Sequence, residues 1–180
     1  MDISDPLNPI ELGYCDTFGY VSNVYVQGEY AYLANWGRGF RVVNISNPSN
    51  LHTVSLYDTR DAALDVCLSG RYAYIADRSN GLVILDLLQP VEVENYPAYS
   101  FIEDVFAAGF TLFVTDRDSG LRILDISDAS NPLEIGQFDT PGFAKGICVN
   151  GNYAYIADWN AGLRILNISD RRAPYETGYY

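Results

Sequence analysis

One short pattern occurs four times in this chain and limits what the chain can fold into. Each copy is a short apolar stretch, a polar turn, a glycine and a second apolar stretch. The copies start at Tyr30, Tyr72, Thr111 and Tyr153 and are therefore almost evenly spaced. A period of about 40 residues that is filled with strands is typical of β-propeller blades rather than of helical repeats.

Two further candidate strands complete each repeat. One closes on a glycine turn just before the repeated pattern, and it lies at 23–26, 65–68, 104–107 and 146–149. The other follows a turn-rich link that contains Pro and Asx residues, and it lies at 10–16, 53–58, 96–100, 133–139 and 175–180. Four short strands in each repeat, separated by turn signals, predict an all-β domain.

The apolar runs select the propeller among the all-β folds. Ile75-Ala76 and Leu82–Leu85 are continuously apolar instead of alternating with polar residues. Continuous runs indicate that both faces of a sheet are covered, as they are when sheets pack side by side around an axis. We therefore expect a single β-propeller, or a fragment of one, over 1–180. Its four blades are predicted at about 17–58, 59–100, 101–139 and 140–180, with an extra outer strand at 10–16.

The repeated residues also resemble a known family. Copies with Tyr-Ala-Tyr-(Ile/Leu)-Ala, then Gly-Leu-Arg-Ile-Leu-Asp-Ile-Ser-Asp and a following Asn-Pro, are similar to the LVIVD repeat. The likeness covers nearly the whole chain, although the third copy departs from it where Thr111 replaces the leading Tyr. The resemblance implies a propeller region of a bacterial or archaeal surface or secreted protein. It implies no catalytic residues.

The number of strands is uneven. The strand type at 10–16 occurs five times, whereas the other three types occur four times each. The surplus is the pattern expected of a piece cut from a longer array. Four blades can close alone, because propellers have about 4–8 blades. Alternatively, two chains could pair their exposed sheet edges in a homodimer that forms an eight-bladed ring.

The candidate ligand-binding residues lie in loops that strand alternation places on one rim of the propeller. Loops on a rigid scaffold often carry function, and Trp and Arg dominate binding hot spots. The candidates are Trp36, Arg38, Arg78, Asn80, Arg117, Asp118, Trp159 and Asn160. For the two tryptophans, packing between blades and contact with a ligand are equally open interpretations. Asp77, Asp116 and Asp158 in the same loops are predicted to cap their own turns.

A second, weaker candidate site is the central channel. Asn23, Asp65 and Asp104 start three of the innermost strands, and their oxygen atoms could hold Ca²⁺. The favoured interpretation is instead that they accept hydrogen bonds from backbone amides of the next blade. Cys67 and Cys148 share one repeat position and are predicted to be buried apolar residues rather than redox or metal thiols.

Charge and composition narrow the choice of partners. The formal net charge is −12, so nucleic acid is a poor partner, and no apolar run is long enough for membrane insertion. The one histidine, His52, lies on a link, so neither a Ser-His-Asp triad nor a His-rich metal centre is available.

These observations predict a non-enzymatic interaction module, displayed extracellularly or on the cell surface, that binds protein or glycan through its rim. No cofactor is expected beyond the weak Ca²⁺ candidate. Two alternatives stay open: a glycan-directed hydrolase that uses rim carboxylates, and a purely structural or assembly repeat unit.

Overall fold

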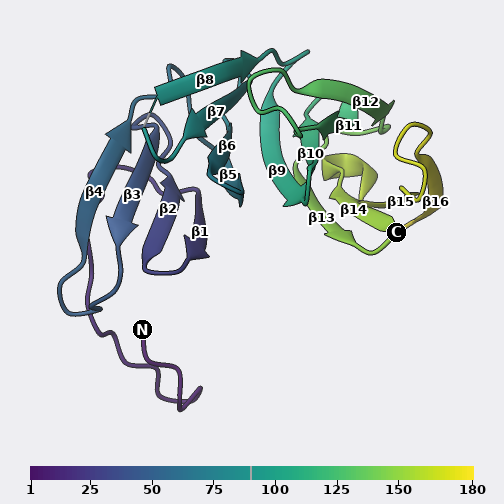
Figure 1. Ribbon diagram of the computed structural model, residues 1–180. Helices are drawn as coiled ribbons and strands as arrows, with labels where there is room; N and C mark the ends of the chain where they lie inside the picture. The colour runs from purple at the N-terminus through teal and green to yellow at the C-terminus, as the bar shows by residue number, and fades with distance from the viewer. Residues whose placement is uncertain (90) are drawn as a thin grey trace.

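The computed structural model describes residues 1–89 and 91–180 and contains four antiparallel sheets, each made of four strands that are consecutive in sequence (Figure 1). We call these sheets the first to fourth blades. The first blade holds β1 (Asn23–Gln27), β2 (Tyr30–Ala34), β3 (Phe40–Asn44) and β4 (His52–Tyr57). The second holds β5 (Asp65–Ser69), β6 (Tyr72–Ala76), β7 (Leu82–Asp86) and β8 (Val91–Tyr96). The third holds β9 (Ile102–Ala108), β10 (Thr111–Asp116), β11 (Gly120–Asp125) and β12 (Leu133–Phe138). The fourth holds β13 (Gly146–Asn150), β14 (Tyr153–Ala157), β15 (Leu163–Asn167) and β16 (Tyr175–Tyr179).

Local chemistry explains why the same hairpin forms in every repeat. The glycine after each polar turn has a positive φ, for example 95° at Gly81, a conformation that is strained for other residues. A Cβ atom at Gly81 would also lie 2.3 Å from the carbonyl oxygen of Tyr96 in the outer strand. The glycine therefore allows the hairpin to turn tightly against its own outer strand.

The third and fourth strands of every blade share one irregularity. Their pairing shifts register once, between Ile84 and Leu85 in the second blade and at the matching place in the other three blades. β-Bulges of this kind add local twist, which lets the outer strand bend away from its neighbour.

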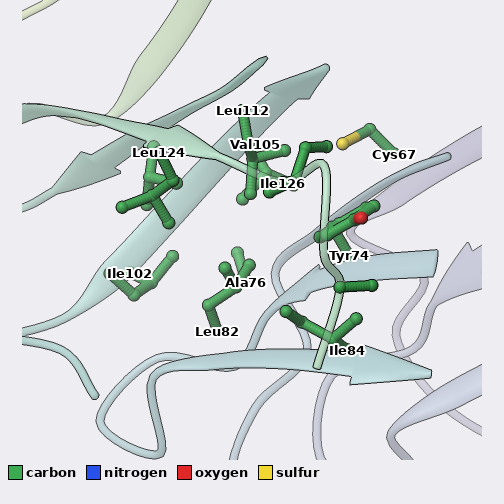
Figure 2. Close-up of a cluster of buried hydrophobic side chains, with 12 residues drawn as sticks. Cys67, Tyr74, Ala76, Leu82, Ile84, Ile102, Val105, Leu112, Leu124 and Ile126 are labelled. Carbon is green, nitrogen blue, oxygen red and sulfur yellow. The ribbon is translucent and has the colours of Figure 1, made fainter. Parts of the chain in front are cut away.

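The hydrophobic core lies between blades rather than within one sheet. Tyr74, Leu82 and Ile84 of the second blade pack against Ile102, Leu112 and Leu124 of the third (Figure 2). Similar clusters join the first blade to the second and the third to the fourth. The central strands of the second and third blades therefore bury both of their faces, as the continuous apolar runs predict.

The four blades form an open arc rather than a closed ring. The first and fourth blades lie at opposite ends of this arc in Figure 1, while the innermost strands touch in the order β1, β5, β9, β13. Leu163 on the fourth blade is 36% exposed, whereas Leu82 and Leu121 at the same repeat position are 0% exposed. Cys148 is likewise exposed while Cys67 is buried, so the expectation of a buried residue is wrong for Cys148, which no following blade covers.

Two sequence-based strand assignments differ from the structure. The outer strand of the second blade is Val91–Tyr96, and residues 96–100 lead into the next blade instead. Residues 10–16 form no ladder, and only Ile10 makes an isolated bridge, to Asp2. A strand needs a partner edge, and the described residues offer none at this position.

The segment at residues 10–16 nevertheless lies where the outer strand of a preceding blade would lie. A Cβ atom at Gly13 would meet the carbonyl oxygen of Pro48 at 1.9 Å, and one at Gly136 of β12 would meet that of Arg171 at the same distance. Cys15 packs against the buried cluster of Ala31, Leu33 and Val43 on the outer side of the first blade. The segment thus covers part of a face that interior blades bury against a neighbour.

Candidate binding rim and blade junctions

One turn position organises the rim. Trp36, Arg78, Arg117 and Trp159 occupy it in the four blades, directly after the second strand or one residue beyond it. Trp36, Arg78 and Trp159 have positive φ values of 42°, 49° and 43°. A non-glycine residue adopts this conformation only at a cost of about 1–2 kcal/mol. Such strain persists only where surrounding contacts hold the backbone in place.

In the first three blades this turn is also joined to the next blade by a backbone bridge. The N–H of Ala63 donates to the carbonyl of Trp36 at 3.2 Å, and that of Ile102 donates to the carbonyl of Arg78 at 3.0 Å. The N–H of Ala144 donates to the carbonyl of Arg117, also at 3.0 Å. Each donor lies two residues before one repeat position, which Asp65, Asp104 and Gly146 occupy in the three blades.

At the junctions between the second, third and fourth blades, arginine side chains stack on phenylalanine rings. Arg78 and Arg117 lie 5.2 and 5.3 Å from the ring centre of Phe101, and Arg117 lies 4.8 Å from that of Phe143. Cation–π contacts of this kind contribute about 0.5–1 kcal/mol each at exposed sites. Two of the predicted ligand-binding arginines, Arg78 and Arg117, therefore also join blades. Sequence reasoning missed Phe101 and Phe143, although both stand three residues before the same repeat position, at Asp104 and Gly146.

The buried aspartates of the rim tie each turn to the incoming loop of its own blade. Asp77 accepts hydrogen bonds from Thr59 Oγ1 at 2.6 Å, from the N–H of Asp61 at 3.2 Å and from Asn80 Nδ2 at 2.8 Å. Burial raises the pKa of Asp77 to about 6, against these hydrogen bonds, which lower it. The expected capping of its own turn holds only for the bond from Asn80, and the other two bonds come from the incoming loop.

Asp116 and Asp158 repeat this arrangement. Asp116 accepts from Ser100 Oγ at 2.7 Å, and Asp158 accepts from Thr140 Oγ1 at 2.7 Å. Both carboxylates are fully buried. Asp118 is exposed beside this network, and its N–H donates to Ser100 Oγ.

The first blade departs from this arrangement because it carries Asn35 where the others carry Asp. Asn35 is fully buried and donates from Nδ2 to the carbonyl of Thr17 at 2.9 Å. Its Oδ1 has no hydrogen-bond partner within the described part of the chain. An unpaired buried acceptor is unusual, since most buried polar atoms are bonded.

Asn35 lines a pocket of about 220 Å³ whose wall also includes Phe18, Tyr20, Trp36 and Arg38. Trp36 is 46% exposed and Arg38 is also exposed, so an indole and an arginine side chain line the same pocket as Asn35. Of the predicted rim residues, the structure brings Trp36 and Arg38 together here.

The other tryptophan lies at the far end of the arc. Trp159 is 68% exposed and lines an open hollow of about 540 Å³ with Lys145 and Leu163. Lys145 Nζ lies 5.7 Å from its ring centre, and the neighbouring Asn160 is exposed. The structure thus separates the two predicted tryptophan sites onto the first and fourth blades.

Arg122 is a structural residue that the sequence analysis did not single out. It is 2% exposed, and its guanidinium group donates to Glu134 Oε2 at 2.8 Å, to Tyr96 Oη at 2.9 Å and to the carbonyl of Pro97 at 3.0 Å. Tyr96 and Pro97 come from the preceding outer strand and the link after it. The repeat-position match with Arg41 and Arg164 is the signal that could have revealed this blade-joining role.

Two of the three channel residues, Asp65 and Asp104, bond the next blade as the favoured interpretation predicts, whereas the exposed Asn23 makes no such bond within the described residues. Asp65 Oδ2 accepts from the N–H of Val105 at 2.9 Å, and Asp104 Oδ2 accepts from the N–H of Ile147 at 2.7 Å. Burial, together with the adjacent Asp65 carboxylate, raises the pKa of Asp104 to about 8. Over the described residues, no group of three or more acidic, His or Cys side chains is arranged to hold a metal ion, and Ca²⁺ binding at Asn23, Asp65 and Asp104 stays an untested prediction.

Comparison with known structures places the fold among propeller-like proteins. The computationally designed Ika8 protein has a TM-score of 0.74 at 10% identity, over 89% of this chain and 49% of that one. The RRP9 WD40 repeats give 0.69 at 14% identity, over 87% of this chain and 50% of that one. The designed Ika4 protein gives 0.68 at 9% identity, over 89% of this chain and 99% of that one. This chain thus spans about half the length of the first two, and the class that the fold defines is the β-propeller.

The family follows from the sequence matches. The LVIVD repeat matches residues 1–17, 18–59, 61–96, 103–140 and 141–180, so the chain belongs to the LVIVD repeat family. No curated protein matches the sequence. Within the described residues, the structure contains no helix with the length and apolarity needed to cross a membrane.

Proposed function

We propose that this chain is a non-enzymatic interaction module of a cell-surface or secreted protein, and that its rim binds carbohydrate or protein at Trp36. The observation that carries the proposal is the pocket of the first blade, where an exposed indole borders a buried, unpaired amide oxygen. The extracellular setting rests on the resemblance to surface proteins that carry the same repeat.

The chemistry of the pocket suits a ring that is flat on one side and polar at its edge. Trp36, Phe18 and Tyr20 offer apolar faces, while Arg38 donates hydrogen bonds and Asn35 Oδ1 accepts them. The pocket volume of about 220 Å³ is below the ~300–1,000 Å³ of ordinary small-molecule sites. It would therefore seat one sugar ring or one side chain of a larger ligand.

The state of the rim carboxylates favours binding over hydrolysis. Asp77, Asp116 and Asp158 are fully buried, and each accepts hydrogen bonds from the incoming loop of its own blade. A general acid or base must instead reach the substrate. A hydrolase that used these three carboxylates would require them to leave the network that joins each turn to its incoming loop.

A glycan array and calorimetric titration of its hits test the proposal, with turnover of each hit followed in parallel. We expect binding without turnover and at least about a tenfold loss of affinity in Trp36→Ala, because buried Trp anchors contribute about 2 kcal/mol or more. Phe110→Ala is the matched control, since Phe110 is 73% exposed but lies in the β9–β10 turn, away from the pocket. Equal losses in the two variants, or hydrolysis of a bound glycan, would contradict the proposal.

A further inference from the structure

We propose that two copies of this chain close head to tail into one ring of eight blades, with the fourth blade of each copy packed on the first blade of the other. We call the side of the first blade that is turned away from the second the leading face, and the side of the fourth blade that is turned away from the third the trailing face. The same type of junction is already formed three times within one chain.

The trailing face carries the same residue types that are buried at an interior junction, but no neighbouring blade covers them within the described residues. Tyr155, Ala157 and Leu163 occupy the repeat positions of Tyr74, Ala76 and Leu82, which are buried in the cluster between the second and third blades. On the fourth blade, Ala157 and Leu163 are exposed and Tyr155 is partly exposed. A neighbouring blade would bury them as it does in the interior, which is favourable by about 25 cal/mol per Å² of apolar surface.

The leading face shows the complementary exposure. Val24 and Val26 of β1 are 54% and 58% exposed, whereas Val66 and Leu68 at the same positions of β5 are buried against the first blade. The leading face therefore lacks the neighbour that the trailing face could supply.

The backbone bridge of the rim is also incomplete at the two ends. Interior bridges join the turn residue of one blade to the residue two before the repeat position of Asp65, Asp104 and Gly146 in the next blade. At the ends of the chain these residues are Trp159 and Val21. Within the described residues, the N–H groups of both make no hydrogen bond. Docking the trailing face on a leading face would bring the N–H of Val21 to the carbonyl of Trp159.

The side-chain stack would continue across the same junction. In the interior, Phe101 stacks with Arg78, and Phe143 with Arg117. The equivalent pair at the ends is Tyr20 and Trp159, which are 83% and 68% exposed. Tyr20 also lines the pocket at Trp36, so Trp159 of a second copy would add to the wall of that pocket. The binding site would then be complete only in the dimer.

A buried arginine at the leading face lacks the same neighbour. Arg41 occupies the position of Arg122, which donates to Tyr96 Oη of the preceding blade. Arg41 bonds only Thr53 Oγ1, and its Nε has no partner within the described part of the chain. The equivalent of Tyr96 on the fourth blade is Tyr180, whose side chain is 97% exposed. A second copy would place Tyr180 beside Arg41.

The length of two similar proteins is consistent with two copies. The chain matches about half the length of the Ika8 and RRP9 chains, so a closed assembly of that size needs about one further arc. A head-to-tail contact either closes into a ring or continues as a filament. In a ring of two copies, the leading and trailing faces of each chain are covered by the other chain.

One segment must move when the ring closes. Residues 10–16 and β16 are alternative outer strands for the same place in the fourth blade. β16 is paired with β15, whereas residues 10–16 form no ladder. We therefore assign β16 to the sheet and expect residues 1–17 to leave the leading face.

Light scattering of the full chain over a range of concentrations is the first test. We expect twice the 20.0 kDa mass of one chain, falling to the mass of one chain on dilution. In Trp36→Phe, where Trp159 is the remaining tryptophan, its fluorescence should shift to shorter wavelength over the same concentration range. A mass of one chain up to the solubility limit, or an open series of larger species, would overturn the proposal.

Variants locate the interface. Leu163→Glu should weaken dimerisation on the order of 100-fold or more, because it removes a buried Leu from two junctions. Leu133→Glu is the matched control, since Leu133 is 64% exposed on the outer strand β12, away from both end faces. Unchanged circular dichroism in both variants shows that the blades fold. Deletion of residues 1–17 should tighten the dimer, and a weaker dimer would overturn the assignment of β16 to the sheet.

Discussion

The second and fourth blades contain the same five residues in their second strands but bury them differently. β6 and β14 both read Tyr-Ala-Tyr-Ile-Ala, and both pair with their neighbours in the same register. Tyr74 and Ala76 of β6 are buried, whereas Tyr155 is only partly buried and Ala157 is exposed. Local sequence therefore sets the strand, and the presence of a following blade sets the burial.

The comparison bears on stability because energy in such an array is shared between neighbours. In repeat proteins, stability is approximately a sum of the stability of each repeat and the terms for the junctions between neighbours. The end blades each lack one junction. They are therefore the regions where a single copy of this chain is least stable. A partner that packs on them would stabilise the chain most.

The largest expected effect is the difference between Tyr74→Ala and Tyr155→Ala. Tyr74→Ala leaves a cavity in a junction and should lower the free energy of unfolding by about 3–5 kcal/mol. Tyr155→Ala should cost about 1 kcal/mol, as substitutions near a surface do. Denaturant unfolding at a concentration where the chain is a single copy measures both values. Equal costs would mean that the trailing face is covered.

The next largest effect compares two arginines at one repeat position. Arg122→Met removes the cation that faces Glu134 and the fully buried Asp116, and it should destabilise by about 3 kcal/mol, because a buried charge loses its partner. Arg41→Met should cost less than about 1 kcal/mol in a single copy, since Arg41 bonds only Thr53. Unfolding curves of the two variants measure these costs. A larger loss of unfolding free energy in Arg41→Met would contradict the inference that the leading face lacks a neighbouring blade.

The smallest expected effect is a pH dependence at the junctions. The pKa of Asp104 is about 8 in the folded state, whereas the unfolded chain releases this proton near 3.8. The folded state therefore binds more protons over this range, and stability falls as pH rises through it. The raised pKa of Asp77 contributes in the same direction, but only up to about 6.

Between pH 6 and 8 the free energy of unfolding should therefore decrease by about 1–2 kcal/mol, and this decrease should come from Asp104. Asp104→Asn keeps an acceptor for the N–H of Ile147 but carries no charge, so its unfolding midpoint should be flat over that range. Asp118→Asn, on an exposed carboxylate, should retain the slope of the parent chain. A flat parent profile would contradict the raised pKa of Asp104.

The rim illustrates how far a binding site can be predicted from sequence. Strand alternation predicted that Trp36, Arg78, Arg117 and Trp159 lie in rim loops, and in the structure they occupy one turn position. The stacking partners Phe101 and Phe143 were missed, because they come from the incoming loop of the next blade. The unpaired Asn35 oxygen was missed too, since only a structure shows which acceptors lack donors.

The sequence by itself determined the family, the four-stranded repeat and the fold class. Apolar runs, turn glycines and an almost even spacing of the repeated pattern are local features, and each repeat carries all of them. The tertiary structure alone decided that the four blades form an open arc and that Cys67 is buried while Cys148 is exposed. The physical reason is that a residue is buried only when a neighbouring blade packs against its face of the sheet. The trailing face of the fourth blade has no such neighbour within the described residues.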